Sequence, residues 1–250
     1  MTSIDNFAVP PTFPETQFRE FAQFAGKFFG SPLSDENWAD PFRKQMHFSL
    51  SLEAILYRYR ACCDCNDEFK RMLRGASDLW RQWGSDREQI YQMERCLYMF
   101  FMNASSVFES VGFCLYFLAH VIQPEQFPLV KNPKDIRWRT TRATFKAAFP
   151  DIPITKLLSE LSQDAGFIEI GKIRNILAHR VAGRRRIRSW SSRRPDGTYS
   201  DVREEKWYLP GSDEQTFDKE LIQRHLNKVT ELLTKLLSAS IELAQASKPA

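Results

Sequence analysis

The order of apolar and polar residues along the chain predicts a protein built mainly of helices. Apolar side chains recur every three or four residues between Thr16 and Gly30, and again from Phe48 towards about Trp80. This period is typical of helices that bury one face. Residues 1 to about 15 hold three prolines and are interpreted as an extended arm.

The clearest helical signal lies between Asp86 and Ile122. Two series of apolar residues repeat there every seven positions, the second starting four residues into the heptad of the first. The first series is Ile90, Leu97, Ala104, Val111 and Leu118, and the second is Phe101, Phe108, Leu115 and Ile122. Such a seam is typical of a bundle helix. Asn103 and Glu109 lie off the seam and are expected in solvent.

Shorter helices are expected near 140–149 and 153–163, and a further one from Asp164 with Ile170, Ile173 and Leu177 on one side. The last helix is expected to run to about Ala246. Its start is placed at Ser212-Asp213-Glu214-Gln215, which is interpreted as a capping box.

The pattern changes between 184 and 209, where Ser, Arg, Trp and Tyr replace the helical period. Arg194-Pro195-Asp196-Gly197 is a turn signal between strand-like arms, so we expect a β-hairpin. The predicted fold class is therefore all-α, a helical bundle with a basic hairpin inserted before the last helix. We expect one helical domain over 1–250, with an N-terminal arm and helix over 1–40.

Composition supports packed helices, because 20 phenylalanines stand against 10 glycines. The five cysteines are odd in number and lie in helical context, which favours reduced thiols in a cytoplasm. Cys62 and Cys65 form a C-x-x-C, but no second pair or nearby histidine completes a zinc set, so a structural role is favoured. We expect no metal or other cofactor.

The N-terminus has neither a basic region nor an apolar run, so no signal peptide is expected. The longest apolar run, Val111–Ile122, is too short to span a bilayer. A cytoplasmic protein without a membrane partner is therefore predicted.

Positive charge is concentrated between Gly171 and Arg194, which hold nine basic residues and no acid, although the whole chain carries only +4. This distribution suits a polyanion such as RNA. The candidate RNA-binding residues are Lys172, Arg180, Arg184, Arg185, Arg186 and Arg188. Alternatively, Asp201, Glu204 and Glu205 return opposite the basic strand and neutralise part of it.

The candidate chemistry lies at Arg174, Asn175 and His179. His179 can exchange a proton near neutral pH, and Arg174 offers a planar, permanently charged fork for phosphate oxygens. Asn175 precedes His179 by four residues and shares its helical stripe, so it can orient the imidazole. Arg174 lies about 140° around an ideal helix from His179. A two-fold dimer, or a helix that ends within the motif, would bring both to one phosphate.

With this context the chain resembles the HEPN superfamily, whose signature is an arginine, four to six residues and a histidine, often with asparagine after the arginine. The resemblance covers the motif helix and, more loosely, the helix of Asp86–Ile122. It implies an all-α bundle, a symmetric dimer and metal-independent RNA cleavage. It also implies a toxin or defence effector that an antitoxin-like protein inhibits. The N-terminal extension and the basic hairpin depart from the family pattern.

These observations predict a dimeric, metal-independent endoribonuclease. The alternative is a non-catalytic helical RNA-binding or scaffold protein that uses the hairpin, and a third possibility is a toxin that acts through protein contact alone. At the residue level, His179 can instead be a helix C-terminal histidine that favours the helix dipole, with Arg174 a solvated charge.

Overall fold

The structure is a computed structural model that describes residues 8–29, 44–83, 87–128, 135–179, 184–208, 216–217 and 219–247. Its elements, in chain order, are α1 (Glu15–Gly26), α2 (Lys44–Trp83), α3 (Arg87–Ile122), α4 (Trp138–Ala148), α5 (Pro153–Leu161), α6 (Ala165–His179), β1 (Arg184–Arg193), β2 (Tyr199–Tyr208), β3 (Thr216–Phe217) and α7 (Lys219–Ala246). The predicted helices and the hairpin are all present.

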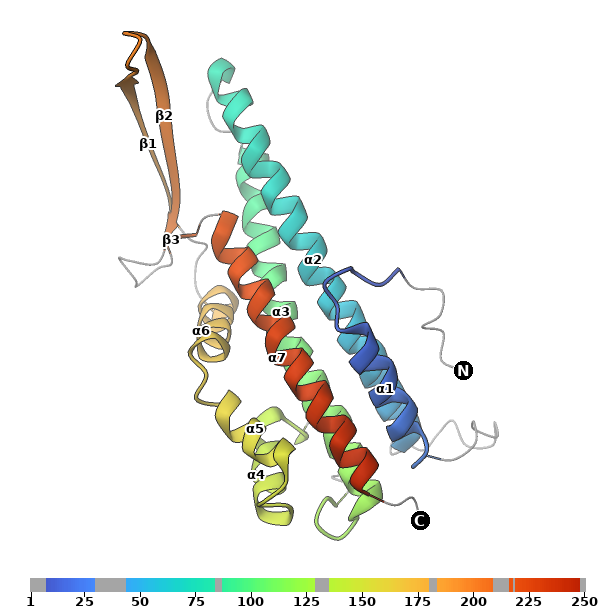
Figure 1. Cartoon of the computed structure of the whole chain (residues 1–250). Helices are drawn as coiled ribbons and strands as arrows, with labels where there is room; N and C mark the ends of the chain where they lie inside the picture. The colour runs from blue at the N-terminus through green and yellow to red at the C-terminus, as the bar shows by residue number, and fades with distance from the viewer. Residues whose placement is uncertain are drawn as a thin grey trace.

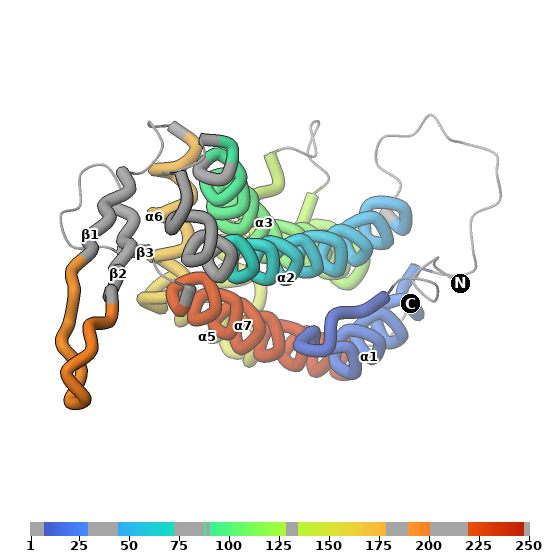
Figure 2. The backbone as a smooth tube through the Cα atoms, turned by 90° about the horizontal axis from the view of Figure 1, so that it is seen from above, coloured from blue at the N-terminus to red at the C-terminus, as the bar shows by residue number. Residues whose placement is uncertain are grey.

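The long helices α2, α3 and α7 run side by side, with α1 against α7 at one end of the bundle (Figure 1). The short helices α4, α5 and α6 form a second row that contacts α3 and α7. Seen from above, the same helices form one packed body from which the hairpin stands apart (Figure 2). The prediction of a mainly helical bundle is confirmed.

Helix α3 lies inside the bundle, in contact with α2, α4, α6 and α7. The heptad seam is buried from Leu97 to Leu118, with Phe101 and Leu115 fully inaccessible, whereas Ile122 is only partly buried. The buried face is wider than the seam, since Phe100, Val107 and Phe117 are enclosed as well. By length and composition Tyr91–Ile122 could cross a membrane, but 67% of its apolar window is buried in the bundle.

The phenylalanine stripe of α1 belongs to the core, where Phe18 and Phe21 are buried. Tyr59 of α2 joins three parts of the chain at this end. Its hydroxyl donates to the carbonyl oxygen of Thr12 at 3.0 Å and lies 2.5 Å from the hydroxyl of Thr230 on α7. The segment before α1 is therefore fixed to the bundle at Thr12.

The hairpin forms as predicted, with β1 antiparallel to β2 and the tight turn closed by Gly197 at a φ of +83°. The start of the last helix was predicted wrongly. Thr216–Phe217 form a short strand that pairs with Trp207–Tyr208, and α7 begins only at Lys219. Ser212–Gln215 lie outside the described residues. Because Thr216 and Phe217 pair with β2, α7 begins further along the chain than the capping-box pattern predicted.

All five cysteines are free thiols held in helices. Burial raises the pKa of Cys65 to about 11 and that of Cys96 to about 12, so both thiols stay protonated at neutral pH. Cys62 and Cys114 are fully buried. Packing therefore accounts for the cysteines of α2 and α3.

Candidate active site

The motif helix α6 is fixed to α7 at its first turn. Asp164 accepts the backbone N–H of Phe167 at 2.9 Å and pairs with the ammonium of Lys228 at 2.8 Å. Partial burial would raise the pKa of Asp164, but the hydrogen bonds from Lys228 and from the helix outweigh it and lower the pKa. A Cβ at Gly166 would stand 2.8 Å from the Lys228 side chain, so glycine permits this close approach. The predicted helix start at Asp164 is confirmed.

A second contact joins the middle of α6 to α7. Glu169 Oε2 lies 3.2 Å from Nε2 of the buried His225, within ion-pair distance. His225 Nδ1 lies 2.8 Å from the carbonyl oxygen of Leu221. Its ring meets the edge of Phe101 on α3, with centroids 5.1 Å apart. The contacts of Asp164 and Glu169 with α7 therefore hold the first half of the motif helix against the core.

Arg174 and Asn175 line one hollow of about 240 Å³, here called the Arg174 hollow. Its other walls are Ser105, Phe108 and Glu109 of α3, Trp138 of α4, and Phe167, Ile170 and Gly171 of α6. Arg174 is half-buried, and its Nη1 donates to Asn175 Oδ1 at 2.9 Å. The carbonyl group of the Asn175 amide is therefore used by Arg174, which leaves its NH₂ group as a donor.

Trp138 closes the hollow from α4. Its backbone N–H donates to Glu109 Oε2 at 2.9 Å, so a carboxylate of α3 caps a helix that has no side-chain cap of its own. The indole packs on Phe167 with centroids 5.4 Å apart and lies over Gly112, where a Cβ would stand 3.2 Å from the ring. The indole Nε1–H is buried and has no hydrogen-bond partner among the described residues.

The remaining predicted site residues are only partly described. Lys172 is exposed on α6, and His179 is the last residue of that helix. The side chains of His179, Arg184, Arg185, Arg186 and Arg188, and the whole of Arg180, lie outside the described residues. Because α6 is helical up to His179, a helix that breaks inside the motif does not bring Arg174 and His179 together. Of the two arrangements expected to bring Arg174 and His179 to one phosphate, the dimer therefore remains as a prediction.

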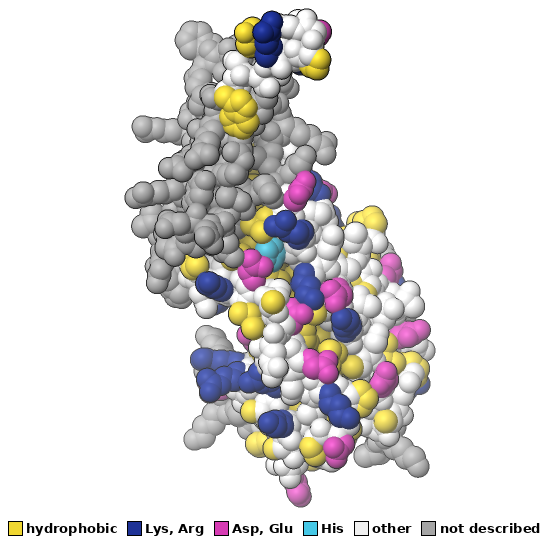
Figure 3. Space-filling model, turned by 60° about the vertical axis from the view of Figure 1, so that its left-hand side comes forward, with side chains coloured by type: hydrophobic (Ala, Val, Ile, Leu, Met, Phe, Trp, Pro, Cys, Tyr) yellow, Lys and Arg dark blue, Asp and Glu magenta, His cyan; other side chains and the backbone are white. Residues whose placement is uncertain are grey.

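Sequence reasoning missed one contribution to this site. Glu109 was expected in solvent, and it is exposed, but it also lines the hollow and caps α4. Helix α4 carries Arg139, Arg142 and Lys146, with no acid between Asp135 and Asp151. These three basic residues do not line the Arg174 hollow. Lys and Arg side chains gather low on the face of Figure 3, at the level of α4 and α5.

The chain matches no protein-family model, no curated protein and no solved structure. No group of three or more potential metal-ligating His, Cys, Asp or Glu side chains occurs within the described part of the chain.

Proposed function

We propose that this protein is a metal-independent endoribonuclease of HEPN type. The observation that carries the proposal is the Arg174 hollow, in which a half-buried arginine and the neighbouring asparagine meet five residues before α6 ends at His179. A guanidinium in a partly enclosed site interacts more strongly with a phosphate than one in bulk water.

The proposed reaction needs no group beyond Arg174, Asn175 and His179. The ribose 2′-hydroxyl loses its proton to a base and its oxygen attacks phosphorus, while the bond from phosphorus to the 5′-oxygen breaks and that oxygen takes up a proton. The products are a 2′,3′-cyclic phosphate and a 5′-hydroxyl. His179 is the proposed proton carrier, Arg174 the proposed partner of the phosphate charge, and Asn175 the residue that orients them.

The non-catalytic RNA-binding alternative has its own support. The tip of the hairpin exposes Trp190 and Tyr199, by 47% and 70%, beside the exposed Arg193 and Arg194. Exposed aromatic rings among cations are typical of surfaces that bind single-stranded RNA. Under the main proposal this hairpin holds substrate, and an inhibitory antitoxin-like protein would compete for it.

The test is incubation of total RNA with the wild-type protein and with His179→Ala, each with and without EDTA. We expect cleavage that EDTA does not affect, 2′,3′-cyclic phosphate ends, and no cleavage by the variant. Arg19→Ala, an exposed arginine on α1 paired with Glu15, is the control for a general effect of substitution. Unchanged cleavage by a folded His179→Ala protein would refute the proposed active site. Bound but uncut RNA in every sample would favour the alternative.

A further inference from the structure

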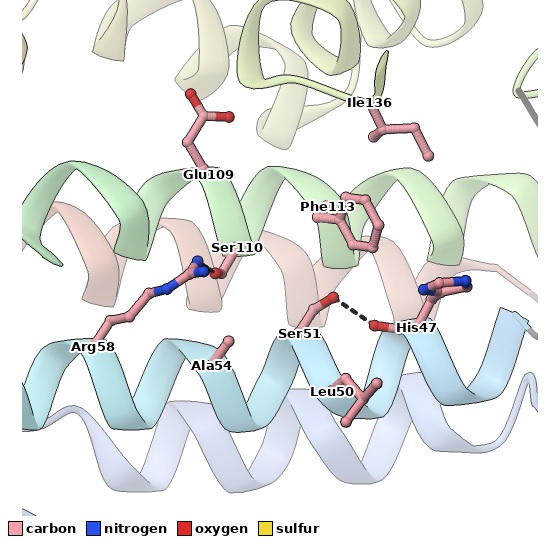
Figure 4. A pocket seen from close by; sticks show the side chains of 9 residues that line it. All are labelled: His47, Leu50, Ser51, Ala54, Arg58, Glu109, Ser110, Phe113 and Ile136. Carbon is pink, nitrogen blue, oxygen red and sulfur yellow. Dashed lines mark hydrogen bonds between the residues drawn. The ribbon is translucent and has the colours of Figure 1, made fainter. Parts of the chain in front are cut away.

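A second hollow, of about 310 Å³, lies between α2 and α3 and shares Glu109 with the first (Figure 4). We call it the Arg58 hollow. One face of α2 supplies His47, Ser51 and Arg58, and α3 supplies Ser110 and Phe113. Its volume falls at the small end of the range for small-molecule sites, which is about 300–1,000 Å³.

Arg58 is half-buried, and only one side of its guanidinium is used by the protein. Nη1 donates to the carbonyl oxygen of Ser106 at 2.9 Å and to the hydroxyl of Ser110. Among the described residues, Nε and Nη2 have no hydrogen-bond partner, and no carboxylate forms an ion pair with Arg58. These two nitrogens form the fork with which arginine holds two neighbouring acceptor atoms.

The other walls suit a flat ring. The ring of His47 meets the edge of Phe113, with centroids 5.9 Å apart, and stacks on Phe117 at 5.1 Å. Glu109 lies on the α3 side of the hollow, and its carboxylate points away from α2 (Figure 4). Its Oε2 accepts the Trp138 N–H, and its Oε1 has no hydrogen-bond partner among the described residues. The hollow thus combines a two-donor fork and aromatic walls, with a carboxylate at its α3 edge.

Three ligand groups fit an arginine fork: a carboxylate, a phosphate and the O6/N7 edge of guanine. The negative charge of Glu109 disfavours both anions, carboxylate and phosphate, but suits a neutral group that carries N–H donors. Guanine has both features, since O6 and N7 accept hydrogen bonds and N1–H and N2–H donate them. We propose that the Arg58 hollow binds a guanine base of the RNA substrate, next to the phosphate that Arg174 holds. This inference rests on the proposed function.

The position of Glu109 supports a shared substrate. It lines both hollows, so a strand whose phosphate lies at Arg174 passes Glu109 on its way to Arg58. A base bound in the Arg58 hollow would fix which phosphate of the strand lies at Arg174. The expected consequence is cleavage next to guanosine.

The experiment measures binding of labelled RNA hexamers, oligoadenylate with one central G, C or U, to the His179→Ala protein. We expect the G hexamer to bind about tenfold more tightly than the others, the low end for one bidentate base contact. Arg58→Lys keeps the charge but loses the fork, and Glu109→Gln keeps the shape but loses the carboxylate. Both should abolish the preference for G. Arg60→Lys, two residues further along α2 and outside the hollow, should retain it.

Equal binding of all hexamers, or a preference for G that survives Arg58→Lys, would overturn the inference. Equal weakening of every hexamer by Arg58→Lys would assign the hollow to a phosphate instead, and also overturns it. The assay does not depend on catalysis. A preference for G together with undiminished cleavage by His179→Ala would therefore refute the proposed active site and leave the guanine site standing. Loss of cleavage in His179→Ala without any base preference would refute the guanine site and leave the active site standing.

Discussion

At the scale of single residues, the Arg174 side chain combines charge with a fixed orientation, since its bond to Asn175 holds the guanidinium at the hollow. Lysine would keep the charge and lose the planar fork. We expect Arg174→Lys to lower kcat for RNA cleavage by about 10²-fold, as removal of one transition-state donor commonly does. Arg19→Lys on α1 is the matched control. A wild-type kcat in Arg174→Lys would show that the fork is not used.

Asp164 carries a second residue-scale prediction, because it caps α6 and pairs with Lys228. Loss of the cap costs about 1 kcal/mol and loss of a partly exposed ion pair up to about 1 kcal/mol. We expect urea denaturation at pH 7 to show Asp164→Ala less stable by about 1–2 kcal/mol. Asp151→Ala, an exposed acid before α5, should be neutral.

The pH dependence follows from the lowered pKa of Asp164 in the folded protein. A carboxylate of this kind contributes its stability above its unfolded pKa of about 3.9 and loses it as the pH falls through the lower folded value. The difference between wild type and Asp164→Ala should therefore be complete at pH 7 and shrink below about pH 4. A difference that grows in acid would mean that Asp164 is not held as a carboxylate.

At the scale of elements, periodicity was sufficient for the helices but not for the hollow between them. The heptads predicted α3 and its buried seam, since a helix carries its packing face in its own sequence. That Trp138 lies over Gly112, and that Glu109 caps α4, depends on which helices become neighbours. No local pattern encodes such a pairing. The strand at Thr216–Phe217 likewise exists only because β2 lies beside it.

The hairpin carries the element-scale prediction, because its register separates the arginines. Arg184, Arg185 and Arg186 lie opposite Tyr208, Trp207 and Lys206, whereas Arg188 lies opposite Glu204. The chain from His179 to Arg184 is at most about 18 Å long when extended. The run Arg184–Arg186 therefore starts near the motif. We propose that they contact RNA phosphates.

Replacing Arg184, Arg185 and Arg186 by Ser should weaken RNA binding and flatten the slope of log K against log salt by about 2 units, at about 0.7 for each phosphate contact. Cleavage at saturating RNA should be largely retained. Arg188→Ser is the internal control and should have a smaller effect than any of the three alone, because Arg188 is paired with Glu204 in the strand register. Identical affinity and slope in the triple variant would assign the strand to structure or to inhibitor contact.

At the scale of the whole molecule, the geometry of α6 favours a dimer, because Arg174 and His179 lie about 140° apart around one ideal helix. Arg174 lines the hollow beside α3, while Ile168 and Asn175 are exposed on α6, Ile168 by 50%. Helix α3 exposes Tyr91, Tyr98 and Met99. Apolar surface of this kind is typical of protein interfaces. We propose that a partner chain packs here and that its His179 completes the site at Arg174.

Light scattering should therefore report about twice 29.2 kDa at micromolar concentration. The Ile168→Asp substitution should shift the protein towards the monomer and reduce cleavage.

Mixing two inactive variants distinguishes the two possible arrangements of the site. Arg174→Ala and His179→Ala protomers mixed in equal amounts form heterodimers in half of the population, and each has one intact site if Arg174 and His179 come from different chains. About a quarter of the wild-type activity should then return. If the two residues of one chain act together, no site is restored and the mixture stays inactive. Restored activity would place Arg174 and His179 across the dimer interface, where the 140° between them on one helix is no obstacle.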